Sequence, residues 1–170
     1  MIVTRRRALA AALFIPIQGM AATCGIVTPR QTEGPFFKPA SPERRKLTDA
    51  ATLVVTGQVL GRDCKPVRNA LLDFWHADEN GEYDNGGFRF RGHQFTDAEG
   101  RYRLETIVPA MYPGRARHIH VKVQPPGGPI LTTQVYFPND PGNARDSLFR
   151  RELAMQMKTA GQATFDFVVA

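Results

Sequence analysis

Short segments in which apolar and polar residues alternate recur along most of the chain. In residues 117–124, Ile119 and Val121 would face one side of a strand, while His118 and His120 would face the other. Comparable segments occupy residues 53–60, 70–75, 94–96, 102–108, 131–137 and 164–169. Turn residues such as Gly, Pro, Asp and Asn separate them. Short strands spaced in this way predict an all-β fold, an antiparallel β-sandwich.

Two further segments complete a predicted single domain of residues 23–170. Residues 23–47 are rich in Pro, Gly, Thr and charge, which predicts a long extended N-terminal arm. Residues 147–158 carry the helical pattern of the chain, and we predict one short C-terminal helix there. With 15 Gly and 13 Pro in 170 residues, turns are favoured over long helices, and the length suits one domain with one core.

The first 22 residues resemble a secretory signal rather than part of the domain. Three arginines at positions 5–7 precede an apolar stretch at 8–17 and small residues at 19–22. The paired arginines suggest the twin-arginine route, and a general export signal or a buried N-terminal helix are the alternatives. We expect an exported protein, periplasmic or extracellular. We expect no membrane association after processing, because the apolar stretch is too short to span a bilayer.

Charge argues against nucleic acid as a partner. The formal net charge of +6 falls to +3 without residues 1–22, because that segment holds three arginines and no acidic residue. The basic run at 44–46 is short, and no stripe of basic residues interleaved with aromatic ones follows it. We therefore interpret the run as a solvated loop.

The two cysteines are Cys24 and Cys64. In an oxidising compartment such a pair is expected to form a disulfide, here between the N-terminal arm and the first hairpin. The alternative is two unpaired thiols.

The polar face of residues 117–124 offers two imidazoles to one metal ion, because His118 and His120 are two positions apart on a strand. Taken alone, this is most simply a polar strand face. Two tyrosines change the balance: Tyr83 lies just past a strand end and Tyr112 lies in a loop bounded by prolines, although loop tyrosines also serve as packing residues. Two phenolates with two imidazoles suit ferric iron, because a phenol of pKa about 10 ionises readily only beside a strongly Lewis-acidic ion.

The other histidines and tyrosines have simpler structural interpretations. Tyr102 and Tyr136 lie in predicted strands and are expected in the core, and His76 and His93 have no partner at ligand spacing. A two-histidine, one-carboxylate iron site would need an acidic residue at that spacing, which the sequence lacks. A zinc hydrolase is also disfavoured, because zinc sites use His, Cys and carboxylate ligands and no convincing base accompanies the histidines.

Six motifs follow one another within residues 23–149. They are TPRQTEGPF at 28–36, W-x7-Y at 75–83, TDAEGRY at 96–102, YP at 112–113, R-x-x-H-x-H at 115–120 and TQVYF at 133–137. In this order they resemble the intradiol ring-cleavage dioxygenases, the family of protocatechuate 3,4-dioxygenase and catechol 1,2-dioxygenase. The resemblance implies a β-sandwich with one Fe(III). Its partners would be a catecholic substrate and O2, and its product a cis,cis-muconate-type dicarboxylate.

The resemblance also implies the metal ligands. Tyr83 and His118 would be ligands that stay in place, whereas Tyr112 and His120 would lie along the other axis. Tyr112 would be the phenolate that leaves when the catecholate binds.

The same resemblance implies residues that act on the substrate. Arg115 would stabilise negative charge that develops on the substrate, and Gln134 would lie near this arginine. Trp75 would be a pocket aromatic residue, and Thr32 in the N-terminal arm would border the substrate pocket.

The sequence departs from the larger family members in three places. The stretch from Tyr112 to His118 is shorter, and Gly114 stands where a Trp is expected soon after Tyr-Pro. As a result Arg117 is a rival of Arg115 as the catalytic cation. The long N-terminal helical region of the catechol enzymes has no counterpart in the sequence, which is similar to the short, exported members.

A non-catalytic binding module is the alternative function. Residues 57–69 and 96–102 also resemble transthyretin-like and carboxypeptidase-regulatory-like sandwiches. The tyrosine–histidine set favours the enzyme, because such modules do not need it. The identity of the catechol and the oligomeric state stay open, and an oligomer is compatible with the resemblance.

Overall fold

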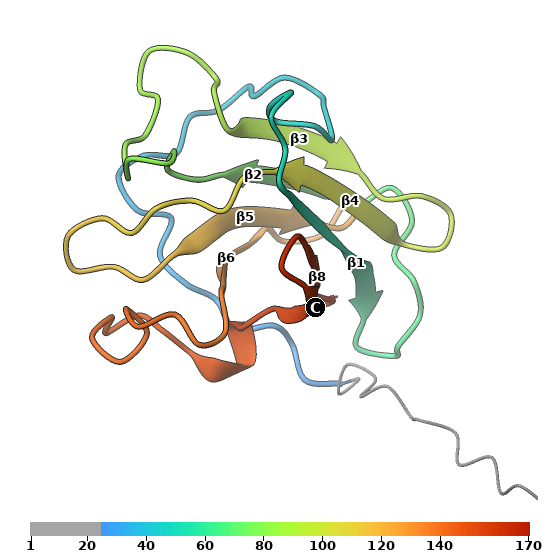
Figure 1. Ribbon diagram of the computed structural model, residues 1–170. Helices are drawn as coiled ribbons and strands as arrows, with labels where there is room; N and C mark the ends of the chain where they lie inside the picture. Colours follow the sequence, from blue (N-terminus) through green and yellow to red (C-terminus); the bar gives the residue numbers. More distant parts are fainter. Residues whose placement is uncertain (1–24) are drawn as a thin grey trace, which may run out of the picture.

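The computed structural model describes residues 25–170, which form two β-sheets packed against each other (Figure 1). The predicted export signal and Cys24 lie outside these residues, so the signal and the Cys24–Cys64 disulfide stay predictions. No helix among residues 25–170 has the length and apolar character of a membrane span.

The β-sandwich is confirmed, and each predicted strand segment overlaps an observed strand. The first sheet is antiparallel, in the order β3 (Arg91–Phe95), β2 (Leu71–Trp75), β5 (His118–Gln124), β6 (Leu131–Tyr136). The second has the order β4 (Arg101–Thr106), β1 (Leu53–Gly61), β8 (Gln162–Thr164), β7 (Gln156–Thr159), with β9 (Phe167–Val169) also on β1. Because β1 runs parallel to β8 and β9, this sheet is mixed rather than wholly antiparallel as expected.

The facing sides of the two sheets form the core. Ile119 and Val121 of β5 are fully buried and belong to one cluster with Leu104 of β4, as the alternation predicts. Tyr102 is buried in the same cluster, and its hydroxyl donates to the carbonyl of Phe165 at 2.8 Å. The core therefore fixes which residues of β5 face outward.

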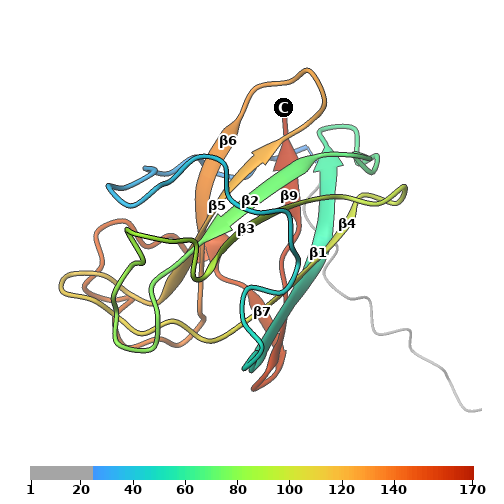
Figure 2. The same ribbon diagram turned by 90° about the horizontal axis from the view of Figure 1, so that it is seen from above.

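The N-terminal arm covers the outer face of the first sheet (Figure 2). The N–H of Gln31 donates to the Thr132 carbonyl of β6 at 2.9 Å, and the N–H of Arg44 donates to the His93 carbonyl of β3 at 2.8 Å. Since β6 and β3 are the two edge strands, the arm crosses the whole sheet. It buries a polar face that would otherwise be solvated.

The predicted helix at 147–158 does not form. The segment holds only a 3-10 turn, Arg151–Leu153 (η1), and then enters β7. Leu153 and Met155 are buried two positions apart, which suits extended chain rather than a helix. The N–H of Met155 donates to the Tyr136 carbonyl of β6 at 2.9 Å, so this backbone finds its partner in a strand.

His76 directly follows β2 and is fully buried as a neutral imidazole. Its Nδ1 donates to the Ala77 carbonyl at 2.7 Å, and its Nε2 accepts the Thr106 hydroxyl at 2.6 Å. Burial disfavours the charged ring and lowers its pKa from 6.5 to about 4. This histidine is therefore structural, as its isolation in the sequence indicates.

We predict that the free energy of unfolding of the metal-free protein falls as the pH decreases from 6.5 to about 4. In that window the unfolded chain binds a proton that folded His76 does not bind. Replacing it, as His76→Asn, should reduce the slope of stability against pH by up to about 1.4 kcal/mol per pH unit. Denaturant unfolding at a series of pH values measures the slope, and an unchanged slope would contradict the assignment.

Candidate metal centre

Two imidazole nitrogens meet on the outer face of β5. The Nε2 atoms of His118 and His120 lie 3.1 Å apart, and both side chains are buried. The Nδ1 of His118 donates to the Ala116 carbonyl at 2.7 Å, which leaves the lone pair on Nε2. The ring of His120 stacks on Trp75 with centroids 4.8 Å apart. Both rings are thus held in fixed orientations, as metal-ligating imidazoles usually are.

Two tyrosines from separate loops lie beside this histidine pair. The Tyr83 hydroxyl is 3.5 Å from Nε2 of His118. The Tyr112 ring lies 5.8 Å from the His118 ring, and the two tyrosine rings meet edge to face at 5.9 Å. All four ligands expected from the sequence, including His120, are therefore neighbours.

Asp78 joins the two tyrosine loops. Its carboxylate accepts the N–H groups of Asn80 and Glu82 at 2.9 Å each, which forms the turn that leads toward the first tyrosine. Its carbonyl accepts the N–H of Ala110 at 2.9 Å, two residues before Tyr112. This buried turn accounts for the proximity of two loops that are distant in sequence.

The spacing and protonation of the histidines fit a metal ion. Two nitrogens bound to one ion at about 2.1 Å and at right angles would lie about 3 Å apart. The observed separation between His118 and His120 is 3.1 Å. Burial lowers the pKa of His118 to about 4 and holds the pKa of His120 well below its usual value. Both rings are consequently neutral near pH 7, the form that binds metals.

The oxygen donors require a strongly Lewis-acidic ion. Burial, followed by the neighbouring Tyr112, raises the pKa of the Tyr83 phenol above its usual value, whereas the charges of Arg115 and Arg91 lower it. Among residues 25–170 no group of three or more His, Cys, Asp or Glu side chains could hold a metal ion. A metal at this position would therefore depend on the tyrosines, a donor set that suits ferric iron.

Arg115 points into the centre, and its rival Arg117 does not. The Nη1 of Arg115 donates to the Tyr112 hydroxyl at 3.2 Å, and its Nη2 donates to Oε1 of Gln134. Arg117 instead pairs with Asp140 at 2.8 Å and is partly exposed. The geometry thus selects Arg115 over Arg117 as the cation of the centre. The sequence favours Arg115 only through the spacing of its motif.

Three residues of this network were not predicted as site residues: Asp146, Tyr136 and Gln31. Asp146 is buried and receives Nε of Arg115 at 3.0 Å. Tyr136, expected simply as core, is buried but uses its hydroxyl to contact Gln31 and Gln134 at 2.8 and 2.9 Å. The sequence could have indicated Tyr136, because Tyr136 and Gln134 are two positions apart on a strand and so share a face. The contact of Asp146 with Arg115 joins residues separated by β5 and β6, so it has no local signal.

The N-terminal arm supplies one wall of the centre. The Thr32 carbonyl accepts Nε2 of Gln134 at 3.0 Å, although the Thr32 residue itself is exposed. Gly34 has a positive φ of 71°, and a Cβ there would lie 3.4 Å from Cε1 of His120. Trp75 is buried beneath His120, so it supports the ring of an expected ligand directly.

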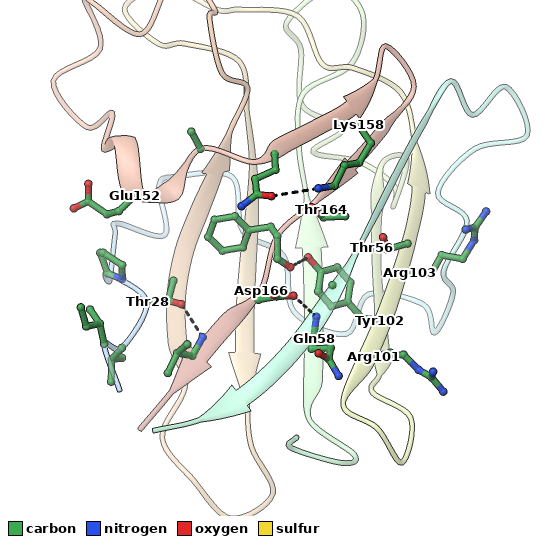
Figure 3. Close-up of a pocket in the computed structure, with 18 of the residues that line it drawn as sticks. Thr28, Thr56, Gln58, Arg101, Tyr102, Arg103, Glu152, Lys158, Thr164 and Asp166 are labelled. Atoms are coloured by element: carbon green, nitrogen blue, oxygen red, sulfur yellow. Dashed lines mark hydrogen bonds between the residues drawn. The ribbon is translucent and has the colours of Figure 1, made fainter. Parts of the chain in front are cut away.

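A hollow of about 1150 Å³ lies on the second sheet, and none of the predicted site residues lines it (Figure 3). Thr56 and Gln58 of β1 and Thr164 of β8 border it. Arg103 also borders it and is paired with Glu105 at 2.8 Å. We interpret this hollow as a solvated sheet face that is separate from the metal centre.

Known proteins with similar sequences are dioxygenases. Residues 33–168 match the model of a dioxygenase family. The chain is 35% identical over 144 residues to catechol 1,2-dioxygenase 2 of Acinetobacter lwoffii, covering 67% of this chain and 52% of the relative. It is 40% identical over 116 residues to the protocatechuate 3,4-dioxygenase beta chain of Burkholderia cepacia, covering 58% and 49%. The chain thus spans about half the length of the curated relatives it matches.

Solved structures show the same fold. The dioxygenase domain of a dioxygenase–carbohydrate-binding protein fusion from Streptomyces sp. SirexAA-E has a TM-score of 0.82 and 56% identity, covering 85% of this chain and 98% of that one. The 3-chlorocatechol 1,2-dioxygenase of Rhodococcus opacus 1CP has a TM-score of 0.74 and 28% identity, covering 83% and 71%.

We predict that Gly34→Ala weakens metal binding while a matched variant, Gly127→Ala, does not. Both glycines have positive φ, 71° and 68°, so alanine should cost about 1–2 kcal/mol at each. Only at Gly34 does the strained backbone lie against an expected ligand, because its Cβ would be in van der Waals contact with His120 at 3.4 Å, whereas nothing lies within 4 Å of a Cβ at Gly127. Thermal unfolding and a ferric-ion titration separate the two effects. Equal metal affinity in both variants would contradict this role of the arm.

Proposed function

The chain belongs to the intradiol ring-cleavage dioxygenase family, and from this membership we propose that it cleaves catechol-type rings with O2 at a single ferric ion. The ring would open between its two hydroxyl-bearing carbons. Both atoms of one O2 would enter the product, a dicarboxylate, so no further reductant is needed. The observation that carries the proposal is the grouping of two buried imidazoles with the Tyr83 hydroxyl within 3.5 Å and the Tyr112 ring beside them.

Four residues would hold the ion: Tyr83, Tyr112, His118 and His120. When bound, ferric iron supplies the electron-withdrawing centre that primes a catecholate for reaction with O2. The phenol oxygens are hard donors that favour Fe(III) over softer or less charged ions. The imidazoles contribute neutral nitrogens without adding charge.

The two tyrosines would have different tasks. Tyr83 is held by its stacked contact with Phe36, with centroids 4.3 Å apart and planes 13° from parallel. Tyr112 instead lies next to exposed Pro113 and Gly114, and its hydroxyl accepts a hydrogen bond from Arg115. This contrast supports Tyr83 as the retained ligand. It also supports Tyr112 as the ligand that the substrate would replace. Its phenol oxygen would then accept a proton from a substrate hydroxyl.

Arg115 and Gln134 would orient and stabilise the substrate. Arg115 is half-buried and is fixed on one side by the buried carboxylate of Asp146, so its remaining N–H groups face Tyr112 and Gln134. A cation held in advance where negative charge develops lowers the barrier without reorganisation. Thr32 would border the same space from the arm, since its carbonyl binds Gln134.

We expect the Fe(III)-loaded protein to show a broad visible band from phenolate-to-iron charge transfer, which shifts when catechol is added without oxygen. Tyr83→Phe and Tyr112→Phe should each alter the band. Tyr102→Phe is the matched control, because its hydroxyl binds the Phe165 carbonyl instead. A colourless protein that demonstrably contains iron would contradict the ligand set and favour a non-catalytic sandwich module.

We expect Arg115→Gln to lower kcat by about 10²–10³-fold, the usual effect of losing one electrostatic stabiliser of a developing charge. Arg117→Gln should leave kcat within a few-fold, because Arg117 pairs with Asp140 away from the centre. Steady-state oxygen consumption with catechol measures both variants. Equal losses in the two would remove Arg115 from its proposed role.

A further inference from the structure

Arg91 is a buried cation that the proposed reaction leaves unused. It begins β3, its residue is only 2% exposed, and among residues 25–170 its Nη2 has no hydrogen-bond partner. Within the same residues it forms no ion pair with a carboxylate. Burying a guanidinium without a carboxylate partner costs free energy, which other interactions of the fold must offset. We therefore ask what its two hydrogen-bonded groups do.

The guanidinium bridges two backbone segments that enclose Tyr83. Its Nε donates to the Asp84 carbonyl at 3.0 Å, and Asp84 directly follows Tyr83. Its Nη1 donates to the Phe36 carbonyl at 2.6 Å. The Phe36 ring is the one that stacks on Tyr83 at 4.3 Å. One side chain therefore ties the loop that carries Tyr83 to the arm that covers it.

The loop needs such a tie because it lacks regular structure between β2 and β3. The Asp84 carboxylate already accepts the N–H groups of Gly87 and Arg89, which orders the turn beyond Tyr83. Those contacts are local, and Lys38, whose Nζ donates to the carbonyls of residues 85–87, joins the turn to the arm but not to the sheet. The bridge from Arg91 fixes the turn relative to the sheet, because Arg91 lies on β3.

The charge of Arg91 also matters at this position. Burial lowers its pKa, while the nearby Asp84, Tyr83 and Asp73 raise it. Among these groups Asp84 has the largest effect, so the turn that follows Tyr83 itself supplies negative charge that favours the guanidinium.

We infer that Arg91 is a positioning residue for Tyr83: its fork clamps the Tyr83 loop to the arm and holds the phenol oxygen against the histidine pair. This inference rests on the proposed function only in taking Tyr83 as a ligand. The clamp itself belongs to the metal-free protein and is testable there.

The first experiment uses metal-free protein labelled with fluorotyrosine, which gives one ¹⁹F resonance for each of the four tyrosines. Tyr83→Phe identifies the Tyr83 signal. Arg91→Lys keeps the charge but cannot span both carbonyls, and it should shift the Tyr83 signal. Arg30→Lys is the matched control, because the Arg30 guanidinium also joins the arm to a backbone carbonyl, that of Ile130, and has no hydrogen bond to Tyr83, Phe36 or Arg91 among the described residues. It should leave the Tyr83 signal in place.

The second experiment uses Fe(III). Arg91→Met removes the buried charge along with the clamp, and it guards against a lysine variant that fails to fold, because an apolar side chain avoids the desolvation cost. We expect both Arg91 variants to shift the visible band and to retain Fe(III) about 10–100-fold less tightly, the usual effect of losing an outer-shell partner.

The outcomes separate this inference from the proposed function. An unmoved Tyr83 resonance in the Arg91 variants overturns the clamp, whatever the iron results are. Equal shifts in Arg91→Lys and Arg30→Lys also overturn it, because the effect would then be general to the fold. If the wild-type protein binds no iron but its Tyr83 signal moves only in the Arg91 variants, the clamp stands and the proposed chemistry fails.

Discussion

The register of β5 between its two neighbours is the constraint on which the rest of the site depends. β5 pairs His120 with Trp75 of β2 and with Gln134 of β6, and this pairing places all three side chains on the outer face. The same register sends Ile119 into the core. A slip of one residue would exchange the two faces, burying imidazoles among apolar side chains and exposing valines. Core packing therefore determines where the ligands point.

The other functional side chains on the outer face of the first sheet come from the N-terminal arm and from loops, not from β5. The arm contributes Gln31, Gly34 and Phe36, and the loops after β2 and β4 contribute the two tyrosines. Each of these contacts is long-range in sequence. The site is consequently a product of tertiary assembly, with only its histidines supplied by a single secondary-structure element.

Sequence patterns predict the parts of this arrangement that repeat locally. Period-two alternation identifies the strands, and motif order groups Tyr83, Tyr112 and the histidine pair, which the structure brings together. The pattern at 147–158 misleads, because two buried positions two residues apart fit a strand once Tyr136 supplies a backbone partner. Arg91 could not be found in this way, since an arginine at the start of a strand is normally solvated. Its burial follows from the arm lying over it.

The contact between the N-terminal arm and β9 has a consequence for how the chain folds. The N–H of Thr28 donates to the Val168 carbonyl at 2.9 Å, and the Thr28 hydroxyl accepts the N–H of Val168 at 2.8 Å. The arm that walls the site is therefore anchored by β9, a strand that is synthesised 140 residues after Thr28. A topology dominated by such distant pairings folds slowly, typically in milliseconds to seconds. The wall of the centre therefore cannot be complete until β9 has been synthesised and has paired with the arm.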